Sequence, residues 1–224
     1  MLNLKDIQKN DPLNRKAQKG IEAKDELSPM DPPDAYGKLD NLGDVDYEKL
    51  PESLKLLMTE HEVCKTHIDD FEKALIGFKE SGFVLDRETS EVFNTFFTFL
   101  DEKVVAHNLK EEKALFPLLE EKLRASGEFN KTNDRNAIDM MEDDHVKISQ
   151  LSTLLFNFLG LIPRLPDLAS RGVVSDLAFH KGMEFIELLR LHIYKEDNTL
   201  FPMAVKLLTE EEFQKVKTSM DKYN

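Results

Sequence analysis

Cysteine, tryptophan and long apolar segments are scarce in this chain, and each scarcity excludes a class of protein. The sequence has one cysteine, Cys64, and no tryptophan. One cysteine excludes an internal disulfide framework and a metal site built from several thiolates of one chain, so nothing requires an oxidising compartment. The longest uncharged run, residues 148–163, is interrupted by polar residues and is shorter than the ~20 apolar residues that cross a bilayer. It predicts a buried helix.

Basic residues and a secretory leader are also lacking. The chain has 30 Lys and Arg against 43 Asp and Glu, a formal net charge of -13 over 224 residues. Such a balance argues against nucleic acid and against an anionic membrane surface as partners. The first 20 residues carry scattered charges and no apolar stretch, so we expect a cytoplasmic protein. Small molecules and other proteins remain as partners.

What the chain does contain is a repeated helical pattern after an irregular start. Residues 1–48 hold much of the proline and glycine, including the stretch at 28–37, and predict an irregular N-terminal arm. From Pro51 onward, apolar residues recur three and four apart, which predicts an all-α domain over residues 49–224. The expected helices are residues 52–80, residues 86 to about 108–115, residues 135–161, residues 173–198, and a short C-terminal helix after the capping box Thr209-x-x-Glu212.

Two parts of the chain repeat each other. Residues 107–117 align without a gap with residues 192–202, and His, Lys, Glu, Leu, Phe and Pro coincide. An acidic residue followed by histidine precedes each copy, as Glu60-His61 and Asp144-His145. Similar helical hairpins that face each other predict an up-down four-helix bundle.

The repeat places histidines and glutamates on helix faces that are otherwise apolar. A His and a Glu four residues apart share one helix face, and apolar residues lead into each of these positions. The set is His61, His107, Glu111, His145, His192 and Glu196. Burying such groups without partners costs several kcal/mol per ionised group, whereas a whole domain has only ~5–15 kcal/mol of stability. A metal pair removes the conflict: each ion takes two histidines, and both share two bridging glutamates. Iron or manganese suits such ligands.

This order of motifs resembles a known family. His, then His-x-x-x-Glu, then His, then His-x-x-x-Glu, with Leu-Phe-Pro after both pairs, is similar to the hemerythrin-like, HHE cation-binding domain over about residues 50–206. The resemblance implies a non-haem di-iron centre on the six residues above. It also implies chemistry with dioxygen, nitric oxide or peroxide, or a role in iron handling. An electron donor or an iron-sulfur protein would then be a partner. The sequence leaves open whether the protein is an enzyme, a reversible oxygen-binding or sensor module, or an iron donor.

Two departures refine the resemblance. Oxygen-carrying hemerythrins have a second histidine where this chain has Ser149, and His-x-x-x-x-Asp where it has His192-x-x-x-Glu196. Four histidines with two glutamates resemble instead the repair-of-iron-centres proteins, which respond to nitrosative and oxidative stress. Those proteins commonly carry an N-terminal cysteine pair, whereas the first 50 residues here contain no cysteine.

Several other residues are expected to be structural. His67 and His180 fall off the ligand faces and are interpreted as surface residues or neighbours of the site. Cys64 is expected in the core, and Tyr194 points away from the site because it lies two residues from His192. The acidic residues beside the repeat, such as Glu112, are interpreted as parts of solvated helix faces.

Overall fold

The computed structural model describes residues 47–127 and 135–223, and every regular element in this part of the chain is helical. The main helices are α3 (Glu52–Glu80), α4 (Arg87–Phe99), α5 (Val105–Lys110), α6 (Phe116–Ser126), α7 (Ala137–Leu161), α8 (Leu168–Lys195), α9 (Phe201–Leu207) and α10 (Glu210–Met220). Single turns of π-helix connect some of them: η3 (Leu100–Val104), η4 (Glu111–Leu115) and η6 (Glu196–Leu200). Turns of 3-10 helix are η2 (Tyr47–Lys49), η5 (Ile162–Arg164) and η7 (Asp221–Tyr223).

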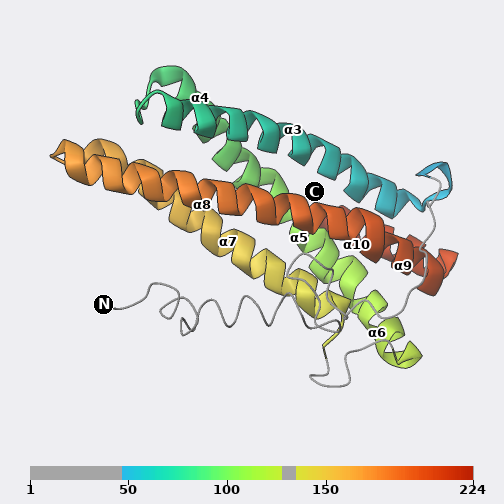
Figure 1. Cartoon of the computed structure of the whole chain (residues 1–224). Helices are drawn as coiled ribbons and strands as arrows, with labels where there is room; N and C mark the ends of the chain where they lie inside the picture. Colours follow the sequence, from blue (N-terminus) through green and yellow to red (C-terminus); the bar gives the residue numbers. More distant parts are fainter. Residues whose placement is uncertain (1–46, 128–134, 224) are drawn as a thin grey trace, which may run out of the picture.

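These elements form an up-down bundle, which confirms the predicted all-α fold. The first long helix is α3, and the second is a continuous rod from α4 to α6 (Figure 1). α7 and α8 form the second hairpin, and α8 also packs against α3. The predicted arm over residues 1–48 lies almost wholly outside the described residues.

Helix ends follow the capping chemistry of the sequence. The Asp86 carboxylate accepts a hydrogen bond from the Thr89 N–H at 2.8 Å, and Thr209 with Glu212 forms the predicted capping box of α10. The prediction that the fourth helix begins at 173 was wrong by one turn and a half, because Asp167 caps α8 by accepting from the Ser170 N–H at 2.8 Å.

The second helix also runs further than predicted, and proline explains its form. Pro117 and Pro202 stand near the start of α6 and α9, directly after π segments η4 and η6. A proline inside a helix has no N–H to donate, and its ring collides with the carbonyl four residues earlier. The wider π turn accommodates this ring, so the rod continues through each proline. Because both prolines belong to the repeat, the two π segments occupy equivalent places.

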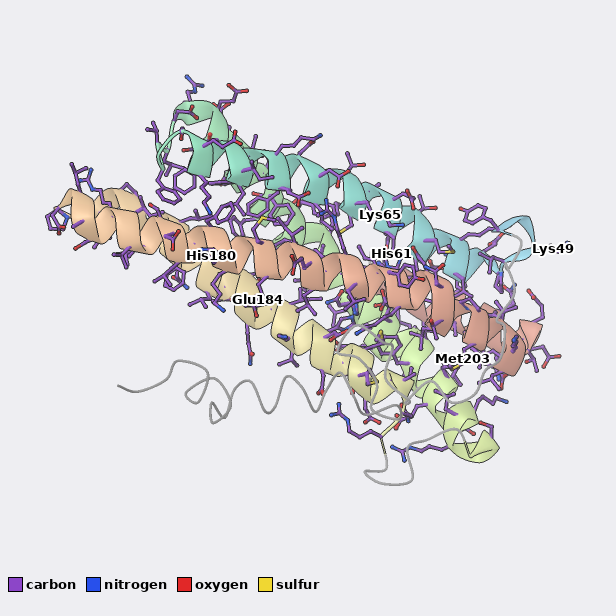
Figure 2. The ribbon with its side chains drawn as sticks, in the orientation of Figure 1. Lys49, His61, Lys65, His180, Glu184 and Met203 are labelled. Atoms are coloured by element: carbon purple, nitrogen blue, oxygen red, sulfur yellow. The ribbon has the colours of Figure 1, made fainter. Side chains whose placement is uncertain are left out.

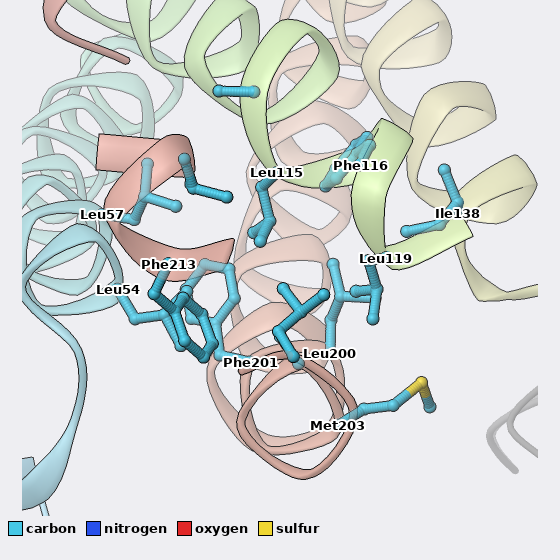
Figure 3. Close-up of a cluster of buried hydrophobic side chains, with 14 of the residues drawn as sticks. Leu54, Leu57, Leu115, Phe116, Leu119, Ile138, Leu200, Phe201, Met203 and Phe213 are labelled. Atoms are coloured by element: carbon cyan, nitrogen blue, oxygen red, sulfur yellow. The ribbon is translucent and has the colours of Figure 1, made fainter. Parts of the chain in front are cut away.

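Buried apolar side chains form two clusters with a polar layer between them. One cluster, at the end where α6, α9 and α10 meet α3, includes Leu57, Leu115 and Phe201 (Figure 3). The other fills the far end around residues such as Phe71 and Phe185. On α3, the chain passes from one cluster at Leu57 to the other at Cys64, and His61 lies between them. α10, whose place the sequence did not predict, packs against α3 and η4 and closes the first cluster.

One stretch, Ala137–Arg164, is long and apolar enough to cross a membrane when judged by length and composition alone. Of its most apolar 18-residue window, 28% is buried. The stretch contains α7, which packs against α8 and contributes Ile148, Leu151 and Leu155 to the core. Since core helices of bundles meet the same criterion, this is weak evidence for a membrane span.

The contact between α8 and α3 yields a prediction about stability. A Cβ atom added at Gly182 would lie 2.4 Å from Cδ2 of Leu75, a fully buried side chain. Gly182→Ala should therefore lower the free energy of unfolding by about 1–3 kcal/mol, because the core has no room for the methyl group. Gly172→Ala on the same helix is the control, since nothing lies within 4 Å of its added Cβ. The Gly172→Ala substitution should raise the free energy of unfolding by up to ~1 kcal/mol. Urea unfolding of both variants measures the difference, and equal effects would contradict this packing.

Candidate metal centre

The structure brings the six predicted site residues together in the polar layer. Each helix of the bundle supplies a histidine: His61 from α3, His107 from α5, His145 from α7 and His192 from α8. The two glutamates begin the π segments, Glu111 in η4 and Glu196 in η6, and both are 0% exposed.

The histidines form two pairs that face each other through their Nε2 atoms. Nε2 of His61 and Nε2 of His107 are 3.0 Å apart, and Nε2 of His145 and Nε2 of His192 are 3.1 Å apart. Pairs of imidazole nitrogens at this distance need a positive charge between or beside them whenever both are unprotonated.

Each glutamate reaches both histidine pairs, one with each oxygen. Glu111 Oε1 lies 3.5 Å from His107 Nε2, and Glu111 Oε2 lies 3.4 Å from His145 Nε2. Glu196 Oε2 lies 3.2 Å from His61 Nε2, and Glu196 Oε1 lies 3.1 Å from His192 Nε2. None of these four buried oxygens makes a well-formed hydrogen bond with the described residues. The donor atoms instead fall into two groups of two His and two Glu, each within 4.8 Å, which fits two cations bridged by two carboxylates.

Carboxylates on the outer side fix the orientation of the imidazoles. His61 Nδ1 lies 2.7 Å from Asp197, and His107 Nδ1 lies 2.8 Å from Glu60. Since an ionised carboxylate only accepts, each Nδ1 donates and each neutral ring turns an unprotonated Nε2 toward its partner. Both lone pairs would then meet at 3.0 Å, a repulsion that a cation relieves. This arrangement of ligand and outer carboxylate is usual around metals.

The second half of the site repeats this arrangement with one looser contact. His145 Nδ1 lies 2.9 Å from Glu112. His192 Nδ1 lies 3.7 Å from Asp144, which is too long for a hydrogen bond. The interpretation of Glu112 as part of a solvated face was therefore wrong, because its carboxylate holds the ring of a site histidine.

Lysines complete this outer shell. Lys110 is 5% exposed, and its Nζ lies 2.5 Å from Glu60. The equivalent residue of the repeat, Lys195, lies 2.9 Å from Asp144. These roles were not predicted from the sequence, although both the acidic residue before the histidine and the Lys before the glutamate recur in the two copies.

Burial and charge shift the pKa values of the site strongly. Burial alone lowers the pKa of His107 and His192, but the carboxylates around them, Glu111 and Glu196 above all, outweigh it and raise both pKa values to about 10. Burial raises the pKa of Glu196, but the neighbouring histidines, led by His192, hold it well below its usual range. At neutral pH the layer therefore contains ionised carboxylates that need positive charge, supplied by protons or by metal ions.

The residues expected to be structural lie where the sequence placed them. Tyr194 is 62% exposed. The His180 side chain is 64% exposed, and it lies further toward the N-terminal end of α8, away from His61 of α3 (Figure 2). His67 stacks on Phe99 with ring centroids 4.0 Å apart. Cys64 is buried as expected, and burial with the nearby Glu196 raises the pKa of its thiol to about 12. Cys64 does not belong to either group of possible metal donors in the described structure.

Two cavities of similar size reach the polar layer from different sides. The first, of about 490 Å³, reaches His61, His107, His192 and Glu196. The second, of about 480 Å³, reaches His145 and contains Ser149 and further hydroxyl side chains. The position that would carry an additional histidine in an oxygen carrier thus lines an open space.

Comparison with known proteins agrees with this geometry. The chain matches the hemerythrin HHE cation binding domain over residues 52–204 and therefore belongs to that metal-binding family. A curated relative, the iron-sulfur cluster repair protein YtfE of Cronobacter sakazakii (strain ATCC BAA-894), is 25% identical over 111 residues, which cover 49% of this chain and 45% of the relative. The matched region is thus less than half of that relative. No solved structure matches the chain significantly.

The raised histidine pKa values predict how stability depends on pH. Folding raises the pKa of His107 and His192 from 6.5 to about 10, so their contribution to stability is complete below pH 6.5 and is lost as the pH rises toward 10. With a chelator present, the free energy of unfolding should fall across this window. The metal-loaded protein should lack this fall, because its imidazoles are already deprotonated. Urea unfolding at a series of pH values measures both, and a flat profile with chelator would contradict the assignment.

Proposed function

We propose that this chain is a hemerythrin-like, non-haem di-iron protein that reacts with small oxidants in a stress response or in iron homeostasis. The observation that carries the proposal is the pair of histidine pairs bridged by two fully buried glutamates whose oxygens have no well-formed hydrogen bonds. Each iron would take two histidines and share Glu111 and Glu196. Manganese is the alternative metal for this ligand set. Since the family and the charge of the chain give no other indication, we propose the cytoplasm as its location.

The chain's own residues define what such a centre would do. Asp197, Glu60 and Glu112 accept the Nδ1 protons and so hold three imidazoles in the tautomer that presents Nε2 to a metal. A bound iron pair supplies electrons for the reduction of dioxygen, nitric oxide or peroxide. Two anionic carboxylates in a set of six ligands favour the ferric state.

The bridging role of the glutamates predicts the metal content. The purified protein should hold about two iron ions per chain, and the double variant Glu111→Ala/Glu196→Ala should lose both, because four histidines without a bridge carry no anionic ligand. The matched control is His67→Gln/His180→Gln, which should keep the iron content and the absorption spectrum. Metal analysis of anaerobically purified protein measures the iron content of each variant. Full metal content in the double glutamate variant would show that these residues are not bridges.

Repair of damaged iron-sulfur centres is the second candidate function. It is favoured by the similarity to YtfE, which is an iron-sulfur cluster repair protein, and by the four-histidine, two-glutamate set. An iron donor would require an iron-sulfur protein as partner, and one iron should leave readily for a chelator. Reversible oxygen binding or sensing is the third candidate, and it requires a stable and reversible adduct.

Exposure to oxygen separates these functions. Ser149 lines the open second cavity, at the position where an oxygen carrier has a histidine ligand. The site therefore has one imidazole fewer than an oxygen carrier, and carboxylates make up a larger share of its ligands. We expect the ferrous protein to become ferric within one exposure to air, and to react with nitric oxide or peroxide as well. Stopped-flow mixing with oxygen, followed by removal of oxygen under vacuum, measures this. Full recovery of the ferrous spectrum would move the protein to the carrier class.

A further inference from the structure

The first cavity is larger than the oxidants of the proposed function require. Its volume is about 490 Å³, roughly sixteen times the ~30 Å³ that a water molecule occupies in the liquid. Cavities of ~300–1,000 Å³ are typical of sites for organic ligands. A diatomic gas or hydrogen peroxide would leave most of this space empty.

The walls of this cavity are mainly apolar, and its charged groups do not favour an anion. Cys64, Phe99, Leu189 and Ile193 line it between the floor and the surface. At the surface Glu102 and Lys103 are both exposed and adjacent in sequence, and neither makes an ion pair within the described part of the chain. Lys110 and Glu60, which also line it, neutralise each other at 2.5 Å. Apart from its histidines, the lining thus holds three carboxylates, with Glu196 at the floor, against two lysines, and the chain as a whole repels anions.

The wall that the second helix contributes contains a turn of π-helix. Glu102, Lys103 and Val104 line the cavity from η3, the third π segment. The segments η4 and η6 each end two residues before a proline. No proline explains η3, because the next one along the chain is Pro117. Unforced π turns are rare and frequently occur at functional sites. Because η3 also lines the second cavity through Leu100, Asp101, Glu102 and Val104, it supports a ligand beside this segment without distinguishing the two cavities.

The floor of the cavity is polar, and it contains carboxylate oxygens that can still accept a hydrogen bond. It consists of His61, His107, His192 and Glu196, and the Glu196 oxygens have no well-formed hydrogen bonds in the described structure. A hydroxyl or hydroperoxyl group can donate to such an oxygen and can also offer its own oxygen to a cation. An alkyl group on the same molecule would lie against the apolar walls.

From this geometry we infer that the first cavity binds an uncharged, mainly apolar organic molecule whose single hydroxyl or hydroperoxyl group lies at the floor beside Glu196. The inference rests on the proposed function for the nature of the floor, and it names the kind of oxidant that this side of the centre admits, an organic hydroperoxide. Its O–O bond would break on taking two electrons from a ferrous pair and two protons from solvent, which would release the outer oxygen as water and leave the alcohol in the same space. The smaller oxidants remain free to use either cavity.

The test uses cumyl alcohol, an unreactive aryl alcohol that represents this class, on the full-length protein. Isothermal titration calorimetry should show saturable binding, both with chelator and after metal loading. Cumene lacks the hydroxyl group and should bind several-fold more weakly, and benzoate, which is charged, should not bind. Equal binding of all three probes, or no binding of the alcohol, would overturn the inference.

Matched substitutions locate the binding. Ala106→Phe adds an aromatic ring to the first cavity and should weaken alcohol binding at least tenfold, whereas Thr98→Phe does the same to the second cavity and should leave it unchanged. Val63→Phe, at the exposed edge of the first cavity, serves where Ala106→Phe does not fold. Iron content is measured in parallel. Wild-type protein that holds two irons but binds no alcohol would refute this inference alone, whereas alcohol binding by wild-type protein that takes up no iron even after metal loading would refute the proposed di-iron function.

Discussion

The rest of the structure depends on one constraint: two carboxylates are fully buried among four imidazoles in the middle of an apolar bundle. Glu111 and Glu196 are 0% exposed, and isolated ionised groups in such surroundings are costly. The cost is offset only if positive charge lies beside them, which explains why the pKa of the histidines is raised and that of the glutamates is lowered. The two apolar clusters on either side hold the layer together, because each long helix passes from one cluster to the other at its histidine.

Duplication of sequence explains how such a layer is built accurately. Each copy supplies a His-x-x-x-Glu pair, a proline that is accommodated by a π turn beginning at the glutamate, and a lysine that holds an outer carboxylate. The acidic residue after one glutamate supports a histidine of another helix, as Asp197 does for His61. Neither hairpin contains a complete metal site, since each group of donors draws on both glutamates. Metal ions held by these groups would therefore couple their binding to the packing of the two hairpins.

Much of this was predictable from the sequence, and the exceptions have physical reasons. The bundle and the burial of these six residues in one layer followed from apolar spacing and from the repeat, because helix periodicity fixes which face a side chain occupies. The role of Glu112 was not predicted, since an acidic residue next to another on a helix is usually solvated and only the three-dimensional structure shows that α7 brings His145 to it. The π segment η3 has no signal in the sequence, and the start of α8 at Leu168 depended on one cap, Asp167.

The two halves of the site differ where the duplication has diverged, and this difference is where function would be specified. Four residues after His61 stands Lys65, which binds Asp197 at 3.1 Å and so stabilises the outer carboxylate of that ring. The equivalent residue four after His145 is Ser149, an exposed side chain that reaches no outer carboxylate and lines a cavity. His61, His107 and His192 thus lie at the floor of the apolar first cavity, where Lys65 reinforces the outer carboxylate of His61, whereas His145 lies beside a space with hydroxyl groups. The repeated scaffold supplies two similar groups of donor atoms, while their unequal surroundings open onto cavities of different chemistry.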